Sequence, residues 1–188
     1  MNTISDPYFR EAVARHVDAY HAGCGDRLQA VYVWGSVRRG EAVRGVSDID
    51  IHAFVADGAG DDWYAAARAA MDAAYPGLGA LSRPLLASLL SDASKPVACA
   101  FGFRLRHDAT RVFGDDLVTD ALVPTPDKAF ARGAFSSVRD LARFAAGQDT
   151  ENKTDFDLPK VPGLRLRKLA RLAVLGGAYL RSICCRLR

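Results

Sequence analysis

The stretch from residue 30 to residue 55, AVYVWGSVRRGEAVRGVSDIDIHAFV, restricts the folds open to this chain. It begins with an apolar, β-branched and aromatic run, residues 31–34, which predicts a buried strand. Gly35 and Ser36 break that run, and a second apolar run at residues 51–55 predicts another strand. The stretch therefore predicts two strands with a glycine-containing turn between them.

Two carboxylates stand at the start of the second predicted strand. Side chains alternate between the two faces of a strand, so Asp48 and Asp50 are expected to point the same way, roughly 7 Å apart along the chain. Carboxylates held side by side repel each other unless a cation lies between them. Paired carboxylates suit Mg²⁺, which typically binds one or two of them together with substrate phosphate oxygens.

The turn after the first strand has features that suit a phosphate. A glycine at position 35 lets a phosphate come close to the backbone, and Ser36 adds a hydroxyl donor. A short helix starting within residues 37–40 would direct free N–H groups toward the same anion. A phosphate cradle beside a metal-binding carboxylate pair indicates a site for a nucleoside triphosphate.

These residues resemble a known signature. Gly35-Ser36, a loop containing Gly40, and the sequence SDIDI at residues 47–51 are similar to the motif of the polymerase-β-like nucleotidyltransferase superfamily. The nearest resemblance is to its small bacterial branch, which includes aminoglycoside nucleotidyltransferases and the minimal nucleotidyltransferases of toxin–antitoxin pairs. The alternative is a tight turn followed by two solvated aspartates. The resemblance implies an α+β fold, with a mixed β-sheet flanked by helices and a C-terminal helical appendage.

The resemblance also implies roles for individual residues. Asp48 and Asp50 would be the catalytic residues and the Mg²⁺ ligands. Nucleotide-binding residues would be Gly35, Ser36, Arg39 and Ser47. An arginine in this loop can hold a triphosphate in a bidentate manner, although it can equally solvate an exposed turn. The implied reaction moves a nucleoside monophosphate from an NTP, with ATP expected, to a hydroxyl on a small molecule or a protein.

One feature departs from the family pattern. Active members carry a third acidic residue on the strand after the second helix, and the corresponding strand here, residues 84–90, contains none. Asp92, Asp108 and Glu41 are the nearest substitutes. Without a third carboxylate, deprotonation of the acceptor or binding of a second metal would suffer. The alternative function is therefore a catalytically weak or inactive partner protein, similar to an antitoxin subunit.

The remaining sequence predicts alternating helices and strands, as in a layered α/β or α+β protein. Helices are expected at residues 7–22, 63–75, 128–146 and 164–185, and strands at 85–90, 97–105 and 112–113. His16 and His21 are interpreted as surface or boundary residues. Pro124 and Pro126 mark a boundary between a nucleotidyltransferase domain at residues 1–123 and a helical segment at 124–188.

The charge distribution and the cysteines bear on the partners and the cellular location of the protein. Residues 160–188 carry eight basic and no acidic side chains, which suggests a solvated basic helix face or a contact with an acidic partner. Cysteines occur at positions 24, 99, 184 and 185 without metal or disulfide spacing, so reduced thiols and a cytoplasmic location are expected. No signal peptide or membrane span is evident. Nucleic acid is not an expected partner, whereas homo- or hetero-oligomers could form through the C-terminal helices.

Overall fold

The computed structural model of the chain describes residues 4–56, 58, 60, 62–79, 81–92, 96–119 and 121. The expected helices at residues 128–146 and 164–185 lie outside these residues, so they remain predictions. The same holds for oligomer formation through them and for the division at residue 123. No helix in the described part of the chain is long and apolar enough to cross a membrane.

A four-stranded mixed sheet forms the centre of the described fold. Its strands are β1 (Leu28–Trp34), β2 (Asp50–Val55), β3 (Leu85–Leu86) and β4 (Ala109–Gly114), in the order β3-β2-β1-β4. The β1 strand pairs antiparallel with both β2 and β4, whereas β2 and β3 run parallel. The strands β1 and β2 contain the two predicted apolar runs. The predicted α+β class, with a mixed sheet flanked by helices, is therefore confirmed.

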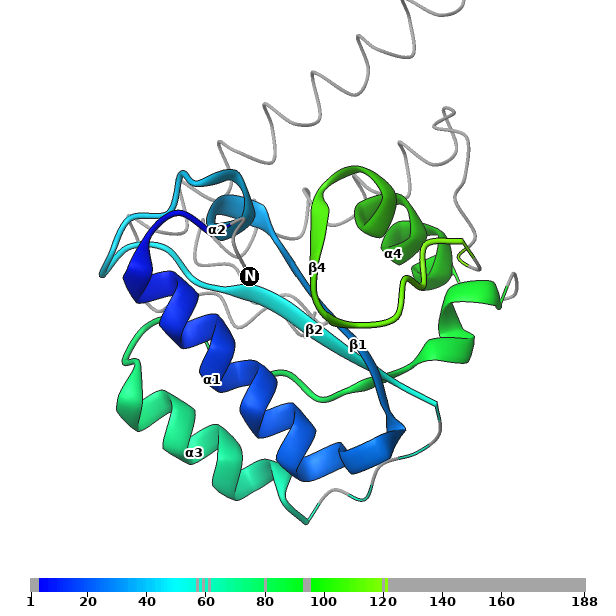
Figure 1. Cartoon of the computed structure of the whole chain (residues 1–188), viewed down its shortest axis with the longest axis horizontal. Helices are drawn as coiled ribbons and strands as arrows, with labels where there is room; N and C mark the ends of the chain where they lie inside the picture. The colour runs from blue at the N-terminus through cyan, green and yellow to red at the C-terminus, as the bar shows by residue number, and fades with distance from the viewer. Residues whose placement is uncertain are drawn as a thin grey trace, which may run out of the picture. The chain divides into compact units, whose positions relative to one another are not determined.

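Helices cover the sheet on both faces. The described α-helices are α1 (Pro7–Cys24), α2 (Gly35–Arg39), α3 (Tyr64–Ala74) and α4 (Pro96–His107), and two short 3₁₀ helices span Gly25–Arg27 and Ala87–Ser91. As Figure 1 shows, α1 and α3 lie together on one side of the sheet and α4 lies on the other. Each side has its own apolar core, one containing α1 and α3 residues and the other containing Leu105 of α4.

The first helix forms where the sequence predicts it. Asp6 caps its N-terminus by accepting a hydrogen bond from the Tyr8 backbone N–H at 2.8 Å, and Pro7 occupies the first turn. The helix ends before Gly25, whose φ of 57° is costly for other residues. The interpretation of His16 as a surface or boundary residue is wrong. Its side chain is 1% exposed because it faces the core with Val13 and its neighbours.

The segment after β3 contains the clearest correction to the secondary structure. Residues 97–105 are predicted to form a strand, but they belong to the helix α4. Apolar residues alternate there with small ones, which imitates a strand, yet positions 98, 101 and 105 contribute to the core at helical spacing. The predicted strand at 85–90 is also shorter than expected. Pairing stops after Leu86, and the chain continues as a 3₁₀ helix.

Candidate functional site

The turn between β1 and α2 contacts the first residue of β2. Trp34 at the end of β1 is paired with Asp50, which places Gly35 directly beside that carboxylate. Gly35 has a φ of 69°, and a Cβ atom added there would lie 2.2 Å from Asp50 Oδ2. A glycine is needed here for two reasons: the left-handed backbone conformation and the space that the Asp50 carboxylate occupies. The predicted turn and the second aspartate therefore lie together.

Asp48 lies on the segment that leads into β2. It is exposed, Asp50 is partly buried, and Ile49 between them is only 7% exposed within the core, a pattern that side-chain alternation produces. The backbone here is held in place, since Ile49 N–H donates to the Leu78 carbonyl at 2.7 Å. A Cβ atom on Gly79 would come within 3.6 Å of Asp48 Cβ. Residues 78–79 therefore support this segment on one side.

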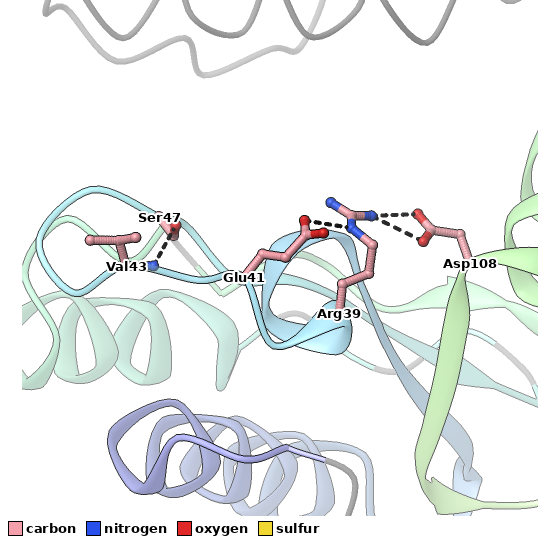
Figure 2. Close-up of polar contacts among 5 residues, drawn as sticks. All are labelled: Arg39, Glu41, Val43, Ser47 and Asp108. Atoms are coloured by element: carbon pink, nitrogen blue, oxygen red, sulfur yellow. Dashed lines mark hydrogen bonds and ion pairs between the residues drawn. The ribbon is translucent and has the colours of Figure 1, made fainter. Parts of the chain in front are cut away.

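Arg39, at the end of α2, is bound to two carboxylates. Its Nε donates to Glu41 Oε2 at 2.9 Å, and its Nη1 donates to Asp108 at 3.1 Å and 3.4 Å, as Figure 2 shows. Partial burial by itself lowers the pKa of the Arg39 guanidinium. The Glu41 hydrogen bond and the two carboxylate charges outweigh that effect and raise this pKa above its ordinary value. Arg39 is therefore firmly cationic and joins α2 to the junction of α4 and β4.

The two serines of the predicted site lie in different surroundings. Ser36 is 7% exposed within α2, and its carbonyl accepts a hydrogen bond from the Glu41 backbone N–H at 2.9 Å. Ser47 lies in the loop before β2, where its Oγ accepts from the Val43 backbone N–H at 2.9 Å (Figure 2). That bond closes a turn and leaves the hydroxyl hydrogen of Ser47 able to donate to another group.

The three substitutes for the third carboxylate have separate positions. Leu78, Ser82 and β3 contact residues 49–55, and the sequence from 78 to 86, LGALSRPLL, contains no acidic residue. Asp92 follows the 3₁₀ helix after β3, and β3 pairs with Phe54 and Val55 at the end of β2. Glu41 and Asp108 both bind Arg39. Asp108 directly precedes Ala109, which pairs with Trp34 on the side opposite Asp50.

The acidic side chains at the candidate site can be compared with the ligands that the expected Mg²⁺ ion needs. Within the described residues, no group of three or more His, Cys, Asp or Glu side chains could hold a metal ion. Mg²⁺ commonly needs only one or two protein carboxylates, because substrate phosphates and waters complete its coordination. Asp48 and Asp50 therefore fit a Mg²⁺ ion that is shared with a triphosphate.

An aromatic cluster beside Asp50 is absent from the sequence-based prediction. The His52 ring stacks on Trp34 with centroids 4.6 Å apart, Phe101 of α4 packs edge-on to His52 at 5.4 Å, and the Arg104 guanidinium lies 5.7 Å from the Trp34 centroid. Burial, and secondarily the Arg104 charge, lower the pKa of His52 to about 4. Side-chain alternation along β2 places His52 on the same face as Asp50, so the sequence alone can indicate His52. Phe101 and Arg104 can be placed in the cluster only when residues 96–107 are recognised as a helix.

No protein-family model matches the chain, and no curated protein matches it. Its fold is similar to a solved structure, described as spectinomycin adenyltransferase AAD(9) from Enterococcus faecialis with ATP and spectinomycin. The TM-score is 0.53 at 12% sequence identity, and the similarity covers 91% of this chain and 90% of that chain. At this identity the likeness is one of fold. The described part of the chain thus has a nucleotidyltransferase-like fold.

Proposed function

We propose that this protein is a Mg²⁺-dependent nucleotidyltransferase that moves a nucleoside monophosphate from an NTP, with ATP favoured, to a hydroxyl on a small molecule or a protein. The observation that carries the proposal is the contact between Gly35 and the Asp50 carboxylate at the end of β1. That contact joins the two halves of the signature at residues 35–51. The similar fold of an adenyltransferase crystallised with ATP and spectinomycin supports the same class of reaction.

The proposed roles follow from the chemistry of the side chains. Asp48 and Asp50 would hold the Mg²⁺ ion that accompanies the triphosphate, while Gly35, Ser36 and Ser47 line the turn that receives the phosphates. An acceptor hydroxyl attacks the α-phosphorus and passes its proton to water. The bond between the α-phosphorus and the oxygen that bridges it to the β-phosphorus breaks, and pyrophosphate leaves. Bound Mg²⁺ supplies positive charge that offsets the charge developing on the leaving pyrophosphate. Arg39 adds a second positive charge near the same turn.

A label-transfer experiment tests this reaction. The full chain is incubated with Mg²⁺ and ATP labelled at the α-phosphate, together with a panel of small alcohols, amino alcohols and candidate proteins. We expect label to appear on one acceptor class, with release of pyrophosphate and loss of transfer in the Asp48→Asn and Asp50→Asn variants. Transfer that persists in both variants would contradict the assigned roles.

The second candidate is a nucleotidyltransferase-fold binding partner, similar to an antitoxin subunit, without useful catalysis. One specific observation favours it: the segment beside β2 contributes no carboxylate near the start of that strand. Without a nearby base, the acceptor proton would have to pass to water, which slows the transfer. Stable co-purification with one protein, without any label transfer, would favour this candidate over the enzyme.

The proposal extends to the cellular location of the protein and to its binding partners. We expect it to work in the cytoplasm with reduced thiols, since its cysteines have no disulfide or metal spacing. Partner binding through residues 124–188 is part of the same proposal and can be tested by comparing the mass of the full chain in solution with that of one subunit.

A further inference from the structure

Asp108 places both of its carboxylate oxygens on one nitrogen of Arg39, a guanidinium that could bind a phosphate instead. A guanidinium presents its N–H donors as a planar fork that matches the paired oxygens of a carboxylate or a phosphate. Both Asp108 oxygens lie within 3.4 Å of Arg39 Nη1, while Glu41 takes the Nε donor (Figure 2). Two acidic side chains therefore already bind the Nε and Nη1 donors of Arg39 and compete with a polyphosphate for this guanidinium.

The charges of this group oppose a polyphosphate. Arg39, Glu41 and Asp108 together carry one positive and two negative charges, so an approaching anion meets a net negative cluster. The Arg39 side chain is 26% exposed and that of Asp108 is 41% exposed. Partly exposed ion pairs contribute little to stability, so an incoming polyphosphate can exchange with one carboxylate at low cost.

Asp108 is the partner that would be exchanged. Trp34 is paired on one side with Asp50 and on the other with Ala109, so Asp108 lies at the same end of the sheet as the candidate metal ligand. Glu41 is only two residues from Arg39 in sequence, whereas Asp108 belongs to the junction between α4 and β4. Exchange at Asp108 therefore changes a contact between distant segments, but exchange at Glu41 changes only a local one.

We propose that Asp108 occupies the polyphosphate position on Arg39, and that a nucleoside triphosphate displaces it when it binds. This inference rests on the proposed function, since it takes a triphosphate to be the ligand. Asp108 then sets the affinity for the nucleotide. Displacement also breaks the ion pair that joins α2 to the junction of α4 and β4.

The test measures ATP binding in the presence of Mg²⁺ by isothermal titration calorimetry with the full chain. Asp108→Asn removes the competing charge, so we expect ATP to bind about two- to fivefold more tightly, the change that the loss of one partly exposed ion pair implies. Asp108→Glu keeps the charge and should stay close to the wild type. Asp115→Asn is the matched control, because it removes one acidic charge at the opposite end of β4.

Arg39 must mediate the effect if the inference is right. In an Arg39→Gln background, Asp108→Asn should no longer tighten ATP binding, because there is no guanidinium left to release. Thermal unfolding checks that each variant is folded, and Asp108→Ser provides a second neutral variant with the same expected gain. Unchanged or weaker ATP binding in Asp108→Asn, or an equal gain in Asp115→Asn or without Arg39, would overturn the inference.

The outcomes also separate this inference from the proposed function. Wild-type binding of ATP that Asp108→Asn leaves unchanged would overturn the exchange at Arg39 and leave the nucleotidyltransferase proposal intact. If neither the wild type nor Asp108→Asn binds ATP, both are overturned.

Discussion

The two faces of the sheet differ in chemistry. On the face covered by α1 and α3, the strands contribute aliphatic side chains that are almost completely buried, namely Val31, Val33, Ile51, Ala53 and Val55. On the face covered by α4, the same two strands contribute Trp34, His52 and Phe54, and β2 begins there with Asp50. The comparison indicates that the first face stabilises the fold and that the second face, at the end of β1, carries the candidate chemistry.

The largest expected effect is a loss of stability caused by a substitution in the core on the aliphatic face. Phe9 of α1 is 1% exposed within that core, so Phe9→Ala should lower the free energy of unfolding by about 3–5 kcal/mol. Chemical denaturation measures this change. Val43→Ala is the control, because Val43 is 51% exposed and its truncation should change stability by no more than about 0.5 kcal/mol. Equal effects of the two substitutions would contradict the stabilising role of this face.

The next effect concerns the turn at the end of β1. Gly35→Ala should cost about 1–2 kcal/mol of stability from its positive φ, and it should also displace the Asp50 carboxylate and abolish ATP binding. Gly45→Ala is a matched control, because Gly45 has a φ of 73° but nothing lies within 4 Å of an added Cβ atom. Denaturation and ATP titration of both variants separate backbone strain from the loss of the site. Normal ATP binding by Gly35→Ala would refute the importance of this contact.

A smaller, pH-dependent effect is expected from His16 on the aliphatic face. Burial lowers the pKa of His16, and the bond to the Ala12 carbonyl and the Asp72 charge on α3 offset this only in part. The pKa of His16 is therefore lower in the folded chain than in the unfolded chain. Below about pH 6.5 the unfolded chain binds more protons than the folded chain, so the stability should fall as the pH drops further. His16→Met should weaken this pH dependence. Identical pH profiles for wild type and His16→Met would contradict the prediction.

The sequence predicts the centre of the fold better than its edges. The strands β1 and β2 and the helix α1 follow from apolar spacing, a capping aspartate and a proline, all of which act locally. The helix α4 does not follow, because its apolar residues also fit the alternation of a strand and only contact with the sheet selects between the two. His16 is misjudged for a similar reason, since burial depends on how α1 packs.

In the candidate site, too, the sequence predicts contacts between residues that are close along the chain but not contacts between residues that are far apart. The turn at Gly35 and its partner Asp50 come from one continuous stretch, so their spacing could be interpreted directly. The contact of Arg39 with Asp108 joins residues that are 69 positions apart in the sequence, and it depends on the register of β1 against β4. No local pattern encodes that register, so the sequence could not indicate which charge lies beside Arg39.

The most direct test of the central claim is the affinity for ATP in the presence of Mg²⁺ when each aspartate of the pair is made neutral. Asp48→Asn and Asp50→Asn should each weaken binding on the order of tenfold or more, because each removes one of the two proposed metal ligands. Asp26→Asn, which neutralises an exposed aspartate at the other end of β1, should leave binding unchanged. Equal affinities for the wild type and all three variants would show that the end of β1 is not the nucleotide site.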